Sequence, residues 1–255
     1  MMKHDEPVLA FTWDGVGYGE DGTLWGGETF LGMPGEWQHV ATMKKFNLPG
    51  ADKAGREPWR SAAAMCWEVG HHYDDAIEID PIVKQAWHQK INSPESTSVG
   101  RLFDAAAALT GVRTMASFEG QGPMEFESLC ERDDARLSDY IEFKLCYNNN
   151  LLIFNWKSLI VSMTDSTLSV VERASIFHSS LAHAILQSAK IFREKHAVNI
   201  VTLSGGVFQN RVLSEYTITL LSANGFKVCL PELIPVNDAG ISFGQVMEYG
   251  YKIKN

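Results

Sequence analysis

The alternation of hydrophobic and polar positions is clearest in the last third of the chain. An apolar run over 199–203 predicts a buried strand, and a glycine-rich turn follows at 204–210. Residues 211–223 have helical periodicity, and 227–230 predict a second strand. A strand, a helix and a strand in this order form the βαβ unit that builds parallel or mixed sheets with helices on their faces. The expected fold class is therefore α/β, with a mixed sheet flanked by helices.

The first third of the chain predicts strands and irregular structure. The apolar run 8–12 is expected to be a strand that ends in a glycine-rich turn over 13–19. Residues 23–31 predict a second strand, in which two neighbouring glycines suggest a bulge. The stretch 33–57 is rich in glycine and proline and is expected to be loop.

Helical periodicity predicts that most of the middle of the chain is helix. Proline at a first helical position and glycine after the last one mark several of the ends. Asparagines tolerate positive φ, so the run at 148–150 predicts a turn between two strands within 139–156. The expected helices are 58–68, a shorter one opened by Pro81, 99–109 closed by Gly111, 123–131, 168–195 and 241–249.

Composition narrows the class of protein. The chain has 255 residues, of which 45% are hydrophobic and 21% charged, as in one large or two small globular domains. The net charge of -9 argues against binding along a nucleic-acid backbone. No apolar stretch is long enough to span a membrane and no secretory signal is visible, so the expected location is the cytoplasm. The four cysteines form no CxxC pair and are expected to be buried, reduced thiols.

Two glycine-rich segments are candidate ligand sites. Gly205 and Gly206 precede a helix N-terminus, whose free N–H groups suit an anion or a sugar phosphate, although a tight turn without ligand fits the pattern equally well. Asp14 follows the first strand, and Asp238 precedes the last helix. Each carboxylate can hold a metal ion or accept a proton, or it can simply cap its own loop or helix.

The histidines indicate no metal centre. His71 and His72, followed by Asp74 and Asp75, are adjacent on a helix end and point about 100° apart, so a solvated helix end is favoured over a metal site. His178 is expected to be a histidine at the edge of the core. No Ser-His-Asp arrangement and no GxSxG motif is apparent.

Six segments, in this order, resemble the C-terminal domain of the carbamoyltransferase HypF family of hydrogenase maturation factors. They cover the chain from about Val8 to Gly250 and are WDGVGYGEDGTLWGGE (13–28), SVGRLFDAAAALTGV (98–112), SFEGQGPMEFE (117–127), FHSSLAHAI (177–185), LSGGVFQNRVL (203–213) and PVNDAGISFGQ (235–245). This domain is similar to the threonylcarbamoyl-transferase TsaD and to the O-carbamoyltransferases NodU and TobZ. The resemblance implies part of an actin/Hsp70/sugar-kinase-like (ASKHA) fold.

The resemblance also implies that the early part of the domain is missing. Residues 1–255 would be the C-terminal TsaD-like carbamoyltransferase domain, without the acylphosphatase-like, zinc-finger and YrdC-like adenylating domains of the family. The family's HHHAH metal motif lies upstream of Val8 and is not matched by His4. The chain is therefore expected to be a fragment, or a split or truncated relative, that a separate N-terminal HypF portion completes.

The residues that match the family's motifs have implied roles. Asp104 would bind ribose hydroxyls, and Asp14 and Asp238 would be carboxylate ligands of a metal whose histidine partners are absent. Zinc, iron or magnesium is therefore expected to bind weakly. Although 224 positions separate the two aspartates, they are expected to converge in one cleft. The implied nucleotide site consists of Asp14, Gly15, Gly17, Asp104, Gly120, Gly205, Gly206 and Asn210.

The implied reaction has two steps. ATP and carbamoyl phosphate give carbamoyl adenylate in the YrdC-like domain, and the present domain passes the carbamoyl group to the C-terminal cysteine of HypE for the cyanide ligand of [NiFe] hydrogenase. The isolated chain is expected to have no transfer activity alone. Two alternatives remain open: a non-catalytic nucleotide-binding or docking module that completes a separate N-terminal polypeptide, and an O-carbamoyltransferase of a small metabolite.

Overall fold

The computed structural model describes residues 6–73, 79–131, 139–231 and 233–254. A mixed sheet in the order β6-β7-β3-β2-β1-β8-β9 runs through the molecule. The pairs β1–β8, β8–β9 and β3–β7 are parallel, whereas β1–β2, β2–β3 and β6–β7 are antiparallel. The strands are β1 (Val8–Tyr18), β2 (Leu24–Met33), β3 (Glu36–Met43), β4 (Phe46–Asn47), β5 (Glu95–Ser96), β6 (Lys144–Asn148), β7 (Leu151–Asn155), β8 (Ile200–Ser204) and β9 (Lys227–Cys229).

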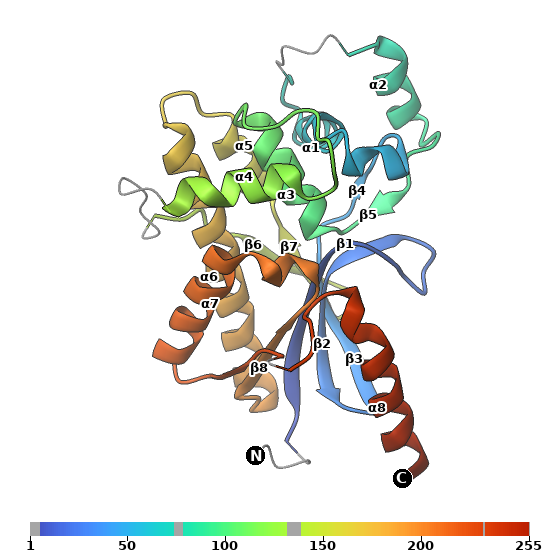
Figure 1. Ribbon diagram of the computed structural model, residues 1–255, viewed down its shortest axis with the longest axis vertical. Helices are drawn as coiled ribbons and strands as arrows, with labels where there is room; N and C mark the ends of the chain where they lie inside the picture. The colour runs from blue at the N-terminus through green and yellow to red at the C-terminus, as the bar shows by residue number, and fades with distance from the viewer. Residues whose placement is uncertain (1–5, 74–78, 132–138, 232, 255) are drawn as a thin grey trace.

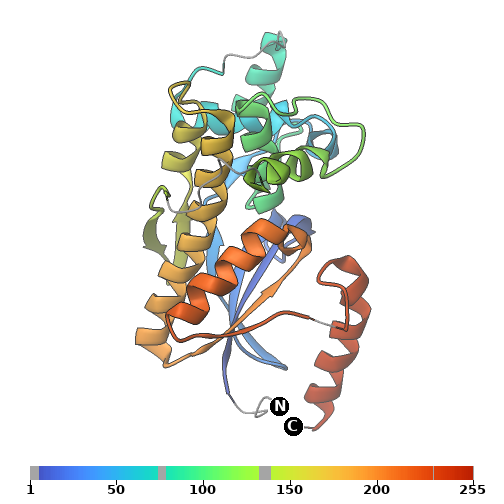
Figure 2. The same ribbon diagram turned by 60° about the vertical axis from the view of Figure 1, so that its left-hand side comes forward.

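Helices cover the sheet unevenly. In both views α1, α3, α4 and α5 gather at one end of the sheet (Figure 1), and α8 stands on the side of the strands away from α6 and α7 (Figure 2). The α-helices are α1 (Trp59–Val69), α2 (Pro81–His88), α3 (Val99–Leu109), α4 (Gln121–Ser128), α5 (Lys157–Met163), α6 (Val170–His196), α7 (Arg211–Ala223) and α8 (Ile241–Lys254). Among the described residues, no helix is long and apolar enough to cross a membrane.

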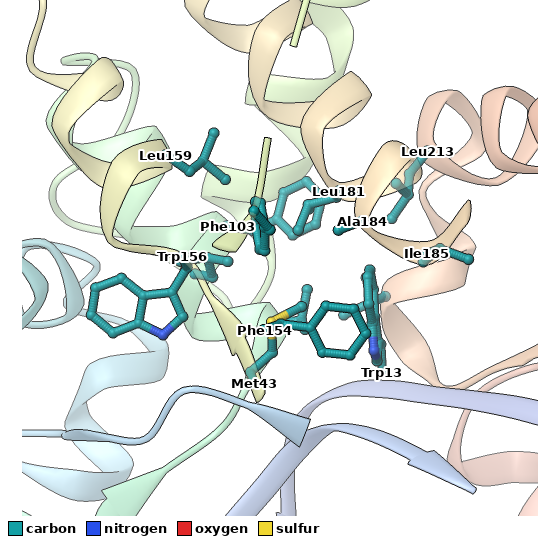
Figure 3. Close-up of a cluster of buried hydrophobic side chains, with 14 of the residues drawn as sticks. Trp13, Met43, Phe103, Phe154, Trp156, Leu159, Leu181, Ala184, Ile185 and Leu213 are labelled. Carbon is teal, nitrogen blue, oxygen red and sulfur yellow. The ribbon is translucent and has the colours of Figure 1, made fainter. Parts of the chain in front are cut away.

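The core lies between the sheet and α3 and α6. Trp13 of β1 and Phe154 of β7 meet edge to face, with ring centroids 6.4 Å apart, beside Phe103 of α3 and Leu181 of α6 (Figure 3). All four side chains are almost completely inaccessible to solvent. Burying aromatic side chains of this size is strongly favourable, so the cleft described below rests on a well-buried base.

The expected α/β class and most of the expected elements are confirmed. The helix 99–109 ends as expected, with Gly111 at φ +75° after its last turn, and Asn149 and Asn150 adopt positive φ between β6 and β7. The helix 211–223 is found with the expected bounds. Residues that tolerate positive φ follow the helix 99–109 and form the turn between β6 and β7, and an N-cap side chain accepts a hydrogen bond at the start of the helix 211–223.

Two expectations about secondary structure are wrong, and one helix was not predicted. Residues 13–18 continue β1 instead of forming a turn, because they pair with β2 beyond a bulge. The stretch 33–57 is not loop, because it contains β3, β4 and a 3-10 helix over Ala51–Gly55. The first positions of β3 face solvent, whereas its last positions are buried. The short helix α5 was not expected.

The cysteines were expected to be buried thiols. All four are free, as expected, and Cys66 is buried, so that burial raises the pKa of its thiol to about 12. Cys146 lies on the edge strand β6 and is exposed, contrary to expectation. Four of the five residues of β6, Cys146 among them, are exposed at this edge of the sheet.

Candidate functional site

A wide bulge in β1 forms one part of the site. Trp13 pairs with Gly27 and Gly17 pairs with Trp25, so that residues 14–16 face Gly26 alone. A Cβ on Gly26 would lie 2.6 Å from the main-chain oxygen of Asp14, closer than side chains are found. Glycine at this position therefore allows the bulge, and the bulge takes Asp14 out of the regular pairing of β1 with β2.

The turn after β8 packs directly against this bulge. Gly205 has φ +101°, and a Cβ there would lie 2.1 Å from the main-chain oxygen of Trp13. Its N–H donates to the oxygen of Val236 at 2.8 Å. The rings of Trp13 and Phe208 are stacked, with centroids 5.5 Å apart and planes 18° apart. The two segments that the sequence marks with glycines thus interlock through the backbone and one aromatic pair.

A cleft of about 840 Å³ opens above this contact. Its walls come from the β1 bulge, the start of α3, the start of α4, the turn after β8 and the segment before α8. Its polar and glycine lining consists of Asp14, Gly15, Gly100, Arg101, Glu119, Gly120, Glu127, Gly206, Gln209, Asn210, Asn237 and Asp238. A smaller adjoining cavity of about 490 Å³ shares Asp14, Asn237 and Asp238 with it and reaches α8.

Asp14 is the carboxylate held between the two glycine-rich segments. Its Oδ1 accepts a hydrogen bond from the N–H of Gly15 at 2.7 Å, and the N–H of Gly206 also donates to it. Burial raises the pKa of Asp14 above its usual value, and Asp238 and Glu119 raise it further, while the two N–H groups lower it. Asp14 and Asp238 therefore lie close enough to interact, as expected.

The residues present do not complete a transition-metal site. Asp14 and Asp238 line the same cleft, but among the described residues no group of three or more His, Cys, Asp or Glu side chains is arranged to hold a metal ion. Zinc and iron favour sites with imidazole or thiolate ligands, which neither aspartate supplies. The carboxylate of Asp14 is also engaged by backbone N–H groups.

A buried ion pair fixes a cation on the opposite wall. The Arg101 side chain is only 4% exposed, and its Nη1 lies 3.1 Å from Oδ2 of Asp104, which is also buried. The pKa of Asp104 is raised to about 7: burial raises it most, Arg101 lowers it, and Glu119 raises it. The other guanidinium nitrogen, Nη2, donates to Oε1 of Glu119 at 2.9 Å.

The N-terminus of α7 is already occupied by the protein's own side chains, so its first N–H groups are not free for an anion. The Oε1 of Glu127 accepts from the N–H groups of Arg211 and Val212, at 2.6 and 3.2 Å. The Oδ1 of Asn210 accepts from the N–H of Leu213 at 2.8 Å. These carboxylate and amide oxygens cap the helix from inside the protein.

A buried histidine orients Asn210 from below. The Nδ2 of Asn210 lies 3.0 Å from Nε2 of His178, and the Nδ1 of the same ring lies 2.8 Å from the oxygen of Ala174. Burial lowers the pKa of His178 to about 4, so the ring is neutral at pH 7. His178 is thus wholly inside the core and not at its edge as expected.

The structure brings together six of the residues implied by the sequence motifs. Asp14, Gly15, Gly120, Gly206, Asn210 and Asp238 all line the cleft. Gly205 borders the smaller cavity, and Gly17 pairs with Trp25 of β2 away from the cleft lining. Asp104 is 1% exposed and lies behind Arg101, so it does not present its carboxylate to the cleft, where a ribose was expected to meet it.

Three charged residues of the cleft were missed in the sequence. Arg101 and Glu119 stand inside the motifs GRLFD and SFEGQG, and Glu127 lies eight positions after Glu119. No spacing rule links Arg101 to a carboxylate 18 positions further on. The only signal in the sequence for these charged residues was therefore their place in the motifs. Of the histidine segment, His71 is exposed as expected, and Asp74 and Asp75 lie outside the described residues.

The topology and the cleft define a class of protein. A mixed sheet flanked by helices, with two glycine-bearing segments meeting in one cleft at the strand ends, defines an α/β ligand-binding fold. Its fold is that of the HypF structures reported below, which is of the expected actin/Hsp70/sugar-kinase type. The family model for the carbamoyltransferase Kae1-like domain, second subdomain, matches residues 10–245. The chain therefore belongs to the HypF carbamoyltransferase family.

Curated relatives support this membership. A carbamoyltransferase HypF homolog from Cupriavidus necator is 33% identical over 96% of this chain, and the carbamoyltransferase HypF of Synechocystis is 32% identical over 97%. The chain spans 66% of the first relative's length and 35% of the second's.

Two solved structures have the same fold. A full-length HypF in its phosphate- and nucleotide-bound form superposes with a TM-score of 0.88 at 30% identity. It matches 98% of this chain, which covers 34% of that protein. The HypF of T. kodakarensis, with a TM-score of 0.83 and 24% identity, shares the fold.

Proposed function

We propose that this chain is the carbamoyl-transfer portion of a HypF-type enzyme and that its cleft binds carbamoyl adenylate. The observation that carries the proposal is the 840 Å³ cleft walled by Gly15, Gly120 and Gly206 in a member of this family. Ligand clefts of about 300–1,000 Å³ take small molecules of this size, and glycine lets the backbone approach them closely. The nucleotide-bound state of the related full-length HypF supports the same choice of ligand.

In the proposed reaction, a thiolate attacks the carbamoyl carbon. The new C–S bond forms as the C–O bond to the phosphate of the adenylate breaks, and AMP leaves with the electron pair. The thiolate comes from the C-terminal cysteine of HypE, which loses its proton before the attack. The carbamoylated thiol would then serve in making the cyanide ligand of [NiFe] hydrogenase. The adenylate would be made by a separate adenylating domain from ATP and carbamoyl phosphate.

Calorimetric titration with AMP tests whether the cleft is the binding site. Wild-type chain should give saturable heat at one site per chain. Gly206→Ala should weaken AMP binding, because a Cβ there lies inside the cleft, 2.9 Å from Oδ1 of Asp14. The matched control is Gly250→Ala in α8, which lines neither cavity and where nothing lies within 4 Å of an added Cβ. Equal AMP affinity of both variants would contradict this placement of the site.

The transfer step needs its own assay. Synthetic carbamoyl adenylate and a peptide with the C-terminal cysteine of HypE are incubated with the chain, alone and with a polypeptide corresponding to the part of longer HypF proteins that this chain does not match. We expect mass spectrometry to find the carbamoyl group on the cysteine in the combined sample. Transfer to small hydroxylated metabolites instead would favour the O-carbamoyltransferase alternative.

A second candidate function, docking to another polypeptide, is favoured by helix α8. Among the described residues, α8 exposes large apolar side chains along most of its length: Ile241, Phe243, Val246, Met247, Tyr249 and Ile253. Its Glu248 ties it to the β2–β3 turn through the N–H of Gly35 at 2.8 Å. The helix stands apart from α6 and α7, and the start of β1 lies at the same end of the molecule as its last turn (Figures 1 and 2).

We assign this apolar face to the unmatched part of a longer HypF polypeptide. Exposed patches of this kind mark protein contacts, and this chain spans about a third of the Synechocystis relative. Val246→Asp should abolish co-purification with that part and leave AMP binding unchanged. Val161→Asp on α5, where the residue is 42% exposed, is the control for an added surface charge. Co-purification that survives Val246→Asp would rule out this assignment.

A further inference from the structure

The groups that suit an anion in the cleft are held by the protein's own carboxylates. Asp14 accepts from the N–H groups of Gly15 and Gly206, and Glu127 accepts from the first N–H groups of α7. Glu119 pairs with Arg101. Of the described residues that line the cleft, four are carboxylates and Arg101 is the one cation. A phosphate group that enters the cleft therefore finds these donors and Arg101 already paired with Asp14, Glu127 and Glu119.

Glu119 is held far less firmly than Glu127. Two backbone N–H groups fix the carboxylate of Glu127, whereas the Glu119 side chain is 65% exposed. Glu119 lies in the short segment before α4, next to Gly120, which begins the helix with φ +85°. Glu119 makes a single contact to one guanidinium, and water reaches its exposed carboxylate and screens that contact. This carboxylate can therefore be exchanged for a better anion.

Arg101 itself stays in place without Glu119. Its guanidinium is backed by Asp104 at 3.1 Å and is packed beside Gly15 and Gly55, where added Cβ atoms would lie 3.5 and 3.1 Å from its terminal nitrogens. Its Nε is buried and has no hydrogen-bond partner. A guanidinium presented in this way offers donors that match the oxygens of a phosphate.

We propose that Glu119 is a displaceable internal anion and that the phosphate of a bound nucleotide replaces it on Arg101. The proposal rests on the nucleotide-binding function proposed above and adds the group that receives the phosphate. In this arrangement Arg101 is the phosphate-binding residue, Asp104 is its positioning residue, and Glu119 lowers affinity for nucleotide until it is displaced. Removing the charge of Glu119 should therefore strengthen, not weaken, the binding of a phosphorylated ligand.

Titrations of AMP and adenosine test this exchange. Glu119→Gln should tighten AMP binding about two- to fivefold, the effect of losing one weak, water-screened ion pair, and leave adenosine binding unchanged. Glu127→Gln is the matched control, because it removes the same charge from the cleft lining while a glutamine oxygen still accepts from α7. Arg101→Gln should bring the affinity for AMP down to that for adenosine. Because this change leaves Asp104 buried without its cation, Arg101→Gln combined with Asp104→Asn provides a second form.

The outcomes separate the two proposals. AMP binding that is equal in wild type and Glu119→Gln, or that tightens equally in Glu127→Gln, would overturn the exchange while leaving nucleotide binding in place. An AMP-to-adenosine affinity ratio unchanged in both arginine variants would overturn the role of Arg101. Failure of AMP and adenosine to bind any form would overturn the nucleotide function together with this inference.

Discussion

The two walls of the cleft are built in different ways. The wall formed by the β1 bulge and the turn at 205–210 is held by backbone contacts so close that Gly26 and Gly205 have no room for a side chain. The wall formed by α3 and α4 is held by charge, through Arg101 with Asp104 and Glu119. Substitutions that add or remove atoms should therefore lower stability most at the first wall. The contribution of the second wall to stability should depend on pH and on changes of charge.

The largest effect is expected at the backbone contact of the first wall. Gly205→Ala should lower the free energy of unfolding by more than about 4 kcal/mol, because it adds a clash 2.1 Å from the oxygen of Trp13 to a backbone conformation that only glycine adopts easily. Urea denaturation followed by circular dichroism measures it. Gly225→Ala has a similar positive φ but open space, so it should cost about 1–2 kcal/mol. An equal loss of unfolding free energy in both variants would mean that the close contact with Trp13 adds nothing to the effect.

The second-largest effect is expected in the packing beneath the first wall. Phe208 is 4% exposed and stacks on Trp13, so Phe208→Ala should lower the free energy of unfolding by about 3–5 kcal/mol. Val161→Ala on the surface of α5 should change it by less than about 0.5 kcal/mol. A loss below about 1 kcal/mol for Phe208→Ala in the same denaturation experiment would show that the turn is not anchored by this ring pair.

The second wall should make stability depend on pH. The pKa of Asp104 is raised from 3.8 to about 7 in the folded chain, so the folded state holds a proton that the unfolded state releases above about pH 4. The free energy of unfolding should therefore fall as pH rises from about 4 to about 7. Asp104→Asn cannot ionise and should flatten this part of the profile, as measured by urea denaturation at several pH values. An identical slope in the variant would assign the pH dependence to other groups.

The smallest effect is expected where the two walls touch. The Oγ of Ser98 accepts from the N–H of Arg101 as the N-cap of α3 and donates to the main-chain oxygens of Asp14 and Gly15. Ser98→Ala should cost about 1 kcal/mol of stability and also weaken AMP binding. Ser169→Ala, at the N-cap of α6, should cost a similar amount without any effect on AMP. If both variants bound AMP equally, Ser98 would be a helix cap only.

The sequence alone determined those features that depend on neighbouring residues. Glycine and asparagine at positive φ, serine and asparagine at N-caps, and 3.6-residue periodicity were enough to place most helices and the β8–α7–β9 unit, because these signals act within a few residues. The ordered motifs also indicated the family and six residues that line the cleft. Residues 33–57 have the composition of a loop but contain β3, because pairing with β2 and β7 stabilises this strand. Local composition does not encode such pairing.

Only the tertiary structure decided what the charged residues do. Asp104 has the motif of a ribose ligand, yet folding places it behind Arg101, where burial raises its pKa more than the neighbouring Arg101 lowers it. Glu127 lies 84 positions from the helix N-terminus that it caps, and Asp14 and Asp238 interact across 224 positions (238 − 14). Charge interactions depend on distance and on exposure to water, and for residues far apart in the chain both are fixed by the fold alone.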